Sequence, residues 1–355
     1  MVMTLGYLEL FERKYGFLRS IENNFKPGTD DVFVAPDLIY KYNLQEGVFL
    51  EGPAVINETG KGNMKLDVIE KINRRPFEEY AKIVSLKDVV SISPSERLRI
   101  SQGPDDAMGK ALDMIVPIGR GQRGLIIAPP KSGKTTILKH MAASIIKNHP
   151  DVSVFVLLVD ERPEEVTDFR RALEQAHVLS SSADESITQH LRMTRMTINI
   201  ATRIAEAGGD AVVFIDSLTR LSRAFNADTR SYGRTLTGGL GANAMEMPRR
   251  IFGAARNIDN GGSLTILATI LIDTGSRMDD IIYQEFVGTG NMDLVLSRRC
   301  AELRLWPAID IQQSGTRKEH LLFEPEEYNE MVSLRRALSG KTETDAMAAL
   351  IEYLK

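Results

Sequence analysis

Residues 128–136 read Ala-Pro-Pro-Lys-Ser-Gly-Lys-Thr-Thr, a spacing typical of loops that hold phosphate groups. The stretch follows the apolar run 124–128 and opens a helical stretch, which is the context in which such a loop binds phosphate. Gly133 lets the backbone approach phosphate oxygens, and the N–H groups at the start of a helix stabilise an anion. Lys134 can reach the β- and γ-phosphates, and the Thr135 hydroxyl can coordinate Mg²⁺. The usual first glycine is alanine here, but the sequence still predicts a nucleotide site.

Two carboxylates at the ends of apolar runs supply further chemistry for ATP hydrolysis. Asp216 ends the run 211–216, where an acid that supports the Mg²⁺ shell is expected, although such an Asp is often only a helix cap. Asp160 and Glu161 end the run 152–160, and a carboxylate there can orient and deprotonate the attacking water. We expect Glu161 to be the general base because it lies closest to the strand end.

Hydrolysis also needs an arginine at the γ-phosphate, and a neighbouring subunit can donate it. The polar, turn-forming segment 312–320, Gln-Gln-Ser-Gly-Thr-Arg-Lys-Glu-His, offers Arg317. Spacing alone leaves open that Arg317 is a solvated surface residue.

The elements expected to position these residues lie in two parts of the chain that have different sequence patterns. Residues 1–80 read as short strands broken by Pro, Gly and Asn, which predicts a small barrel. Residues 81–110 have weak periodicity, and we interpret them as a connector. From residue 111 to 355, apolar runs that look like buried parallel strands alternate with helical stretches, which predicts a doubly wound α/β domain. Two closing helices are expected at the C-terminal end.

Composition excludes several other classes of protein. The 355 residues have an ordinary globular balance, with 43% hydrophobic and 26% charged residues. A single cysteine, Cys300, excludes an internal disulfide framework and fits a reducing compartment. No apolar run reaches the length of a membrane helix, and the N-terminal residues have no signal pattern, so we expect a cytoplasmic protein. The net charge of −4 means that any nucleic-acid binding must rest on local patches.

Several motifs together closely resemble the family of bacterial transcription termination factor Rho. They include "PIGRGQRGLIIAPPKSGKTT", "LLVDERPEEVTD", "FIDSLTRLSRAFN", "DTGSRMDD" and "PAIDIQQSGTRKE". The first motif and "DER" would also suit the catalytic subunits of rotary ATP synthases, but "SGTRKE" with "DTGSRMD" would not. The resemblance implies a RecA-like P-loop ATPase domain preceded by a cold-shock-like OB fold that binds RNA. It implies a homohexameric ring that moves 5′→3′ along RNA with ATP and Mg²⁺ and displaces the transcript from RNA polymerase.

By matching motifs, the resemblance assigns nucleotide-site roles to this chain. Lys134, Glu161 and Arg317 would be catalytic, with Arg317 acting across a subunit interface, and Thr135 and Asp216 would serve the Mg²⁺. Arg304 would be a second arginine that senses nucleotide, and Trp306 would lie beside adenine, although it could instead be a core residue. The remaining nucleotide-binding assignments are Gly119, Arg120, Gly121, Gln122, Arg123, Gly124, Lys131, Ser132, Gly133, Thr136 and Arg162.

Two RNA sites are implied, one on the barrel and one in the ring. Tyr15 and Phe17 are two apart on a strand and therefore face the same side, where exposed rings can stack on bases. Periodicity alone leaves open that they face the barrel core. Arg19 is expected to reach phosphate. The barrel residues assigned to RNA are Lys14, Tyr15, Phe17, Arg19, Asp31 and Phe33, and those of the pore loops are Arg234, Thr235 and Arg277.

Two other functions remain as alternatives at this level. The chain could be another hexameric RecA-like motor such as a DNA helicase, or an RNA-binding module whose ATPase is degenerate. The complete set of catalytic residue types argues against the second. Family members usually carry a small helical module before the barrel, whereas this sequence opens at "MVMTLGYLEL"; either this member lacks it or the sequence is trimmed, and RNA loading or assembly is expected to differ accordingly.

Overall fold

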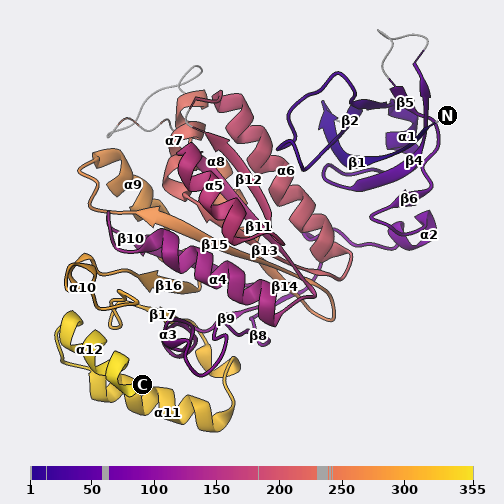
Figure 1. The fold of residues 1–355 in the computed structure, drawn as a ribbon. Coiled ribbons are helices and arrows are strands. Elements are labelled where there is room, and N and C mark those ends of the chain that lie inside the picture. Colours follow the sequence, from indigo (N-terminus) through magenta and orange to yellow (C-terminus); the bar gives the residue numbers. More distant parts are fainter. Residues whose placement is uncertain are drawn as a thin grey trace.

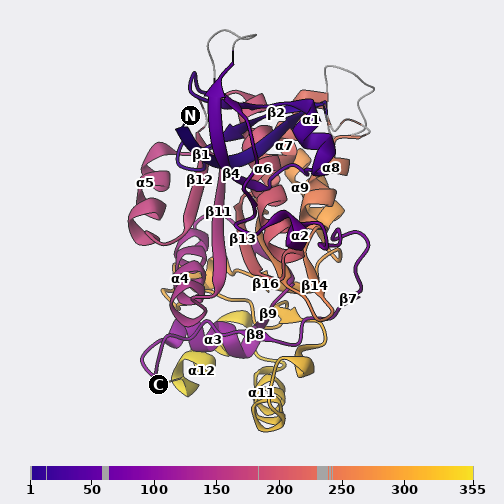
Figure 2. The same ribbon diagram turned by 90° about the vertical axis from the view of Figure 1, so that its right-hand side faces the viewer.

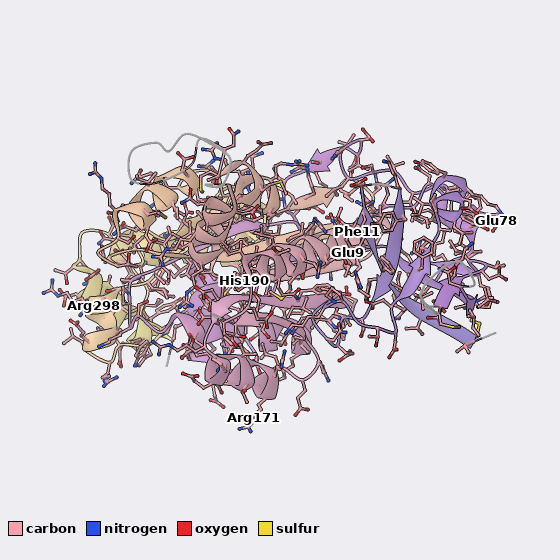
Figure 3. All side chains as sticks on the ribbon, turned by 90° about the horizontal axis from the view of Figure 1, so that it is seen from above. Glu9, Phe11, Glu78, Arg171, His190 and Arg298 are labelled. Carbon is pink, nitrogen blue, oxygen red and sulfur yellow. The ribbon has the colours of Figure 1, made fainter. Side chains whose placement is uncertain are left out.

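The computed structural model describes residues 2–12, 14–57, 64–182, 184–229, 239, 241 and 243–354. Figures 1 and 2 show a small β-rich domain lying toward one end of a larger α/β domain, with the C-terminal helices at the other end. From above, the two domains lie side by side (Figure 3). This arrangement agrees with the predicted order of a barrel followed by an ATPase-like domain.

The N-terminal domain is a closed barrel. Its strands pair in the order β1-β2-β3-β5-β4, and β4 pairs again with β1 to close the ring. The strands are β1 (Val2–Phe11), β2 (Tyr15–Arg19), β3 (Val32–Val34), β4 (Phe49–Ile56) and β5 (Met64–Leu66), and β6 (Lys71–Ile72) extends β4. Alternate residues such as Leu8, Leu18 and Leu50 point into a buried core, which the helices α1 (Pro36–Lys41) and α2 (Phe77–Tyr80) flank.

The second domain is built on a mostly parallel sheet in the order β12-β11-β13-β15-β10-β16. The parallel strands are β10 (Arg123–Ala128), β11 (Val152–Glu161), β12 (His177–Ser182), β13 (Asp210–Asp216), β15 (Ser263–Leu271) and β16 (Met292–Val295). The short β17 (Gly315–Thr316) adds an antiparallel edge to β16. Because these strands are parallel, their carboxyl ends meet along one edge, where ligands bind in such sheets.

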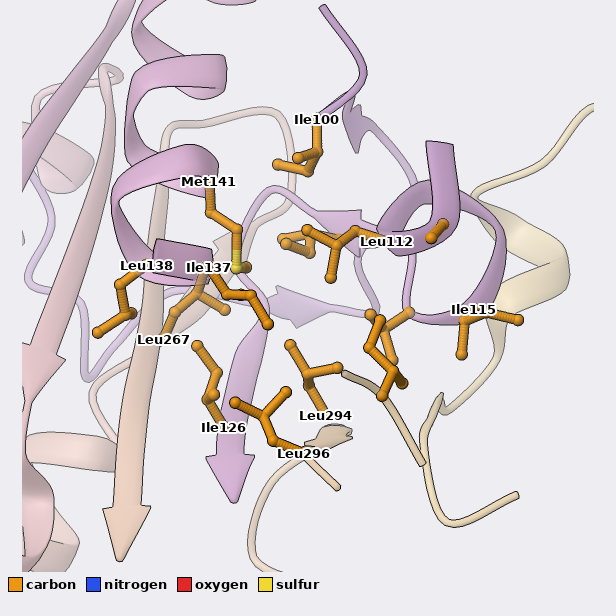
Figure 4. Close-up of a cluster of buried hydrophobic side chains, with 14 of the residues drawn as sticks. Ile100, Leu112, Ile115, Ile126, Ile137, Leu138, Met141, Leu267, Leu294 and Leu296 are labelled. Carbon is orange, nitrogen blue, oxygen red and sulfur yellow. The ribbon is translucent and has the colours of Figure 1, made fainter. Parts of the chain in front are cut away.

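Helices cover both faces of this sheet, which explains the continuous apolar runs of its strands. One face packs against α3 (Ala107–Ile115), α4 (Lys134–Asn148), α5 (Pro163–Ala172), α11 (Pro325–Leu338) and α12 (Glu343–Tyr353), and part of this core is drawn in Figure 4. The other face packs against α6 (Ile187–Glu206), α7 (Leu218–Thr229), α8 (Glu246–Phe252) and α9 (Arg277–Phe286). Strand β10 shows the division, because Ile126 contributes to the first core and Leu125 to the second.

Much of the predicted connector packs on the ATPase domain. Strand β7 (Ser91–Ile92) pairs with β14 (Arg256–Ile258), and β8 (Arg97–Leu98) pairs with β9 (Ile118–Gly119). Leu98 and Ile100 are buried in the core of the larger domain. Two-residue strands are too short to have a periodicity, so they could not be predicted from the sequence.

Among the described residues, no helix combines the length and the apolar character that a membrane crossing requires.

Candidate functional site

The phosphate loop lies at the carboxyl end of β10, directly before α4. Lys131 and Gly133 adopt left-handed backbone conformations, with φ of 65° and 86°, and the Ser132 hydroxyl donates to the Pro129 carbonyl at 2.8 Å. This alternation turns successive backbone N–H groups toward one concave side, which suits an anion. The pocket has a volume of about 190 Å³ and is lined by residues 129–136 and Leu271. It therefore brings together the predicted Lys131, Ser132, Gly133, Lys134, Thr135 and Thr136.

Both predicted carboxylates converge on Lys134. Its Nζ lies 2.5 Å from Asp216 Oδ1 and 3.7 Å from Glu161 Oε1. Thr269, from the neighbouring strand β15, donates its hydroxyl to the same Asp216 oxygen at 2.8 Å. Glu161 and Asp216 are each 1% exposed, yet Glu161 Oε2 and Asp216 Oδ2 have no hydrogen-bond partner among the described residues. Buried unpartnered oxygens are costly, so their presence here indicates a place where a ligand or water binds.

A β-bulge turns Glu161 into this site. The pairing of β11 with β12 shifts between Val159 and Glu161, and Asp160 between them has a φ of 56°. A bulge re-aims the residue that follows it. Arg220, on α7, then donates to the Asp160 carbonyl and lies 3.5 Å from Glu161 Oε1. Arg220 and the bulge were missed from the sequence, since neither belongs to a local spacing pattern.

The surroundings of Glu161 favour the role of a general base over that of a permanently charged member of an ion pair. Burial raises the pKa of the Glu161 carboxyl, and the nearby Asp216 carboxylate raises it further. Lys134 and Arg220 oppose this rise in pKa. A carboxylate with a raised pKa binds a proton more readily, which is the property that a general base for water requires.

Of the three further predicted nucleotide residues, Trp306, Arg162 and Arg304, the first contacts the loop. The Trp306 ring lies against the loop, because a Cβ added at Gly133 would be 2.4 Å from its Cζ3 atom. Trp306 is 38% exposed and so is not a core residue. Arg162 precedes α5 directly after Glu161, and Arg304 lies two residues before Trp306; both are exposed.

The assignment of residues 119–124 to nucleotide binding stays a prediction, and these residues do not line the phosphate loop of their own chain. These residues, Gly119, Arg120, Gly121, Gln122, Arg123 and Gly124, precede or open β10, whereas the phosphate loop follows its other end, about 17 Å away at the rise of a strand. Arg120 instead pairs with Glu96, Asp151 and Asp210 at the amino-terminal edge of the sheet. The motif is adjacent to the loop in sequence but is separated from it by the strand.

Arg317 lies at this same amino-terminal edge. It follows β17, where Thr316 pairs with Met292, and Met292 in turn pairs with Gly124 at the start of β10. Arg317 is exposed and its guanidinium donates only to the Gly288 carbonyl, at 3.4 Å, among the described residues. It therefore cannot reach the phosphate loop of its own chain, and a finger role requires a second copy.

On the barrel, the predicted rings lie outside the core. Tyr15 is 37% exposed, and its ring centroid lies 6.1 Å from that of Phe17 and 6.0 Å from that of Phe33. Phe11, which the sequence analysis missed, stacks on Tyr15 with centroids 5.6 Å apart. The signal for Phe11 was its register opposite Tyr15 across the β1–β2 turn. The four rings form an aromatic platform, and Lys14 beside it is exposed.

Arg19, which was expected to reach phosphate, is bound to carboxylates of the barrel in this structure. It is 4% exposed, and its guanidinium binds Glu9 Oε2 at 2.6 Å and the Asp31 carboxylate. It also lies over the Phe17 ring, 5.1 Å from the centroid. Two carboxylates already neutralise this arginine, so its place in the structure is beneath the platform. A role of Arg19 and Asp31 in RNA binding stays a prediction.

Glu9 extends this network to the ATPase domain. Figure 3 places Glu9 at the boundary between the two domains. Its Oε1 accepts from Arg192 at 2.8 Å and from Arg195 at 3.4 Å, and both arginines belong to α6. Glu46 of the barrel pairs with Arg195 at 3.2 Å as well. Ion pairs from the buried Glu9 and from Glu46 therefore join the barrel to α6.

Of the predicted pore residues, Arg277 begins α9 and is exposed. Two residues on, Asp279 is buried and accepts from Nε and Nη2 of Arg223 on α7. Arg234 and Thr235 lie outside the described residues.

Comparisons with known proteins match both domains. Residues 4–78 match the model of the Rho termination factor RNA-binding domain, and residues 109–316 match that of the ATP synthase alpha/beta family nucleotide-binding domain. The chain is 45% identical over 353 residues to transcription termination factor Rho of Cereibacter sphaeroides, which covers 99% of this chain and 83% of that protein. It is also 45% identical over 359 residues to the Rho protein of Aquifex aeolicus, covering 100% of this chain and 82% of the relative.

Solved structures support the fold. A prototypical ATPase from the type III secretion system of pathogenic bacteria superposes with a TM-score of 0.61 at 22% identity, covering 70% of each chain. The assembled ATPase EscN of enteropathogenic E. coli superposes with the same score at 20% identity, covering 75% of this chain and 68% of that one. At these identities the likeness concerns the fold alone.

Proposed function

The chain belongs to the transcription termination factor Rho family, and on that premise we propose that it works as a ring of copies that hydrolyses ATP while moving 5′→3′ along RNA. In this proposal the ring pulls the nascent transcript out of RNA polymerase and so ends transcription. The observation that carries the proposal is the convergence of Lys134, Asp216 and Glu161 at the phosphate loop, where one oxygen of each carboxylate has no partner among the residues that the structure describes.

Each residue at the loop has a separate task. Lys134 and the backbone N–H groups of residues 131–134 bind the phosphates. Glu161 Oε2 accepts the proton of the attacking water, and Arg220 and Lys134 fix the other oxygen of the same carboxylate. Trp306 covers the loop and offers its indole face to the base of the nucleotide.

The site fits Mg²⁺ that enters with the nucleotide. Among the described residues, no group of three or more His, Cys, Asp or Glu side chains could hold a metal alone. Thr135 and the unpartnered Oδ2 of Asp216 would contribute to the shell together with the phosphates. When bound, the ion supplies charge neutralisation at the γ-phosphate.

RNA would bind in two places that do different work. The aromatic platform of Phe11, Tyr15, Phe17 and Phe33 stacks on bases and captures single strands. The loop before α9 follows strand β15 of the large sheet, and in this proposal Arg277, at the start of α9, couples RNA in the pore to hydrolysis. Repetition of these arginines around a ring gives a basic channel in an acidic protein.

The test is ATPase activity with and without pyrimidine-rich single-stranded RNA, with DNA of the same sequence as the matched control. The proposal predicts strong stimulation by RNA and little by DNA. Stimulation by DNA alone would favour a DNA motor instead, and an absence of hydrolysis with RNA bound would favour a binding module.

A further inference from the structure

Two parts of the barrel dock on α6, the helix of the larger domain that lies next to the barrel in Figure 1. The first part carries Glu9 and Glu46. Glu9 Oε1 accepts from Arg192 at 2.8 Å, and Arg195 lies 3.4 Å from Glu9 and 3.2 Å from Glu46. A Cβ added at Gly47, where φ is 87°, would be 2.7 Å from a backbone atom of α6. The barrel therefore meets α6 with paired charges and in close contact.

The second part is the loop between β2 and β3. The Asn24 side chain accepts from the backbone N–H of Ser180 on β12 at 3.1 Å, and the Asn24 carbonyl accepts from Gln189 of α6 at 3.1 Å. Phe25 is 0% exposed and belongs to the same core as Met193 of α6. Asn24 and Phe25 have φ values of 57° and 59°, which such residues keep only where surrounding contacts fix them. This loop is therefore built into the larger domain.

Helix α6 is in turn packed on elements of the nucleotide and pore sites. Its buried Met193 and Met196 share one core with Ile215, the residue before the end of β13, and with Ile282 of α9. Helix α9 begins with Arg277, the predicted pore residue. Because a close-packed interior is stiff, the barrel and Arg277 are attached to one body.

The docked part of the barrel also supports the aromatic platform. Glu9 and Phe11 lie on the same strand, β1. Glu9 Oε2 binds Arg19 at 2.6 Å, and the Arg19 guanidinium lies 5.1 Å from the centroid of the Phe17 ring. A single buried carboxylate therefore joins the underside of the platform to Arg192 of α6.

A fixed spacing between two sites changes how a strand that reaches both is bound. Once the strand is held at one site, binding at the other depends on an effective concentration that the geometry between the sites sets. Holding both sites on one body removes the cost of ordering them when the strand binds. A barrel that turned freely on its connector would lose this gain.

We propose that Glu9, Arg192 and Arg195 are positioning residues for RNA, which hold the aromatic platform at a fixed place relative to Arg277 so that one strand binds both. The inference rests on the proposed function, in which platform and pore receive the same RNA. The three residues act through the position of the barrel and make no contact with the reacting groups. Their loss should therefore change the RNA concentration that is needed, and not the maximal rate of hydrolysis.

The double variant Arg192→Gln/Arg195→Gln in the full chain tests this. The matched control is Arg298→Gln, because Arg298 pairs at 3.0 Å with Glu302 inside the single helix α10 (Arg298–Glu302). Two pyrimidine-rich RNAs are compared: a short one of about 4–16 nucleotides, which fits one OB-fold site, and a long one that reaches the pore. The dissociation constant is measured for each RNA, and ATPase activity is titrated with the long RNA.

The expected result is a split between affinity and rate. The concentration of long RNA for half-maximal ATPase should rise about tenfold, a part of the 10²–10⁴-fold gain that linking two sites gives. The affinity for short RNA and the maximal ATPase rate should match those of the control. An unchanged half-maximal concentration, or equal weakening of short and long RNA, would overturn the inference.

A milder variant covers the case in which the double variant does not fold. Glu46→Gln removes one charge from the pair with Arg195 and leaves Glu9 bound by Arg19, Arg192 and Arg195. It should show the same split with a smaller rise, and a folded Glu46→Gln chain with wild-type titration by long RNA would overturn the inference. A wild-type chain without RNA-stimulated ATPase would instead refute the proposed function.

Discussion

Glu9 and Glu161 are both buried glutamates beside arginines, but their oxygens are used differently. Both oxygens of Glu9 are occupied, one by Arg19 at 2.6 Å and the other by Arg192 and Arg195 of the second domain. Glu161 has one oxygen near cations at 3.5–3.7 Å and the other without a partner among the described residues.

Whether both oxygens of the carboxylate have partners distinguishes a structural carboxylate from a catalytic one in this molecule. A buried acid whose oxygens are all compensated contributes its charge to the packing of two domains. A buried acid with an unpartnered oxygen and a raised pKa keeps a bond available for chemistry. Burial alone does not distinguish them, because Glu9 is 0% exposed and Glu161 is 1% exposed.

The largest expected effect is on the rate of ATP hydrolysis, and it concerns Arg317, which belongs neither to the surroundings of Glu9 nor to those of Glu161. Arg317→Ala should lower the maximal rate of RNA-stimulated ATP hydrolysis by roughly 10³-fold, because an arginine finger stabilises the charge of the transition state. Since Arg317 cannot reach its own loop, rings mixed from Arg317→Ala and Glu161→Gln chains should regain some turnover. Rings shown to mix without any regained turnover would contradict donation between subunits.

Glu9→Gln should act on stability instead of chemistry. Removing one charge from a buried pair costs about 3–5 kcal/mol, and here it leaves Arg19, Arg192 and Arg195 with less compensation. Thermal unfolding should shift to lower temperature, with the barrel signal affected first. Glu12→Gln, on the same hairpin at an exposed position where Glu12 pairs with the exposed Lys14, is the matched control and should change little. An unchanged unfolding temperature of Glu9→Gln would contradict the role of the Glu9 ion pairs in holding the barrel on α6.

The aromatic platform offers a smaller effect on a third quantity, RNA affinity. Tyr15→Ala combined with Phe17→Ala should weaken capture of single-stranded RNA by about 1–3 kcal/mol for each lost stack. ATPase with short RNA at saturation should stay intact, whereas Arg277→Ala should show near-normal capture and little stimulation. Equal loss of capture in both variants, with normal stimulation of Arg277→Ala, would contradict this division.

The smallest effect concerns the pH dependence of stability. Burial and Asp216 raise the pKa of Glu161 in the folded protein above its ordinary value of 4.5. Between the ordinary and the raised value the folded state holds more of this proton, so stability falls as pH rises through that window and stays lower above it. Glu161→Gln should therefore be more stable than wild type at neutral pH, with the advantage vanishing below pH 4. If Glu161→Gln were still more stable than wild type at low pH, its higher stability would have a cause other than the raised pKa of Glu161.

Local patterns predicted more of the nucleotide site than of the domain junction. Lys134 and Asp216 follow from short motifs at strand ends, and parallel strands must bring those ends together. Arg220 escaped prediction because its contact depends on a bulge at Asp160. Glu9 escaped for a different reason: its partner Arg192 is 183 residues away, and an acid in an alternating strand reads as exposed.

The distance between residues 119–124 and the phosphate loop was also not predicted from the sequence. Residues 119–124 stand next to the phosphate loop in the sequence, but β10 carries the chain across the whole sheet between them. Arg123 therefore lies at the amino-terminal edge of the sheet, near Arg317. Proximity along a chain predicts proximity in space only when no strand intervenes.

The most direct test of the account is a single-turnover experiment on Glu161→Gln. Radiolabelled ATP is bound to RNA-loaded rings in excess over ATP, and its conversion to ADP is followed with time, with wild type and Glu9→Gln as controls. The account predicts that Glu161→Gln binds ATP normally and converts it about 10²–10⁴-fold more slowly, because the amide cannot accept the proton of water. Glu9→Gln rings, at a temperature where they remain folded, should convert it at close to the wild-type rate. Conversion by Glu161→Gln at the wild-type rate would contradict the assignment of the unpartnered oxygen to the chemistry.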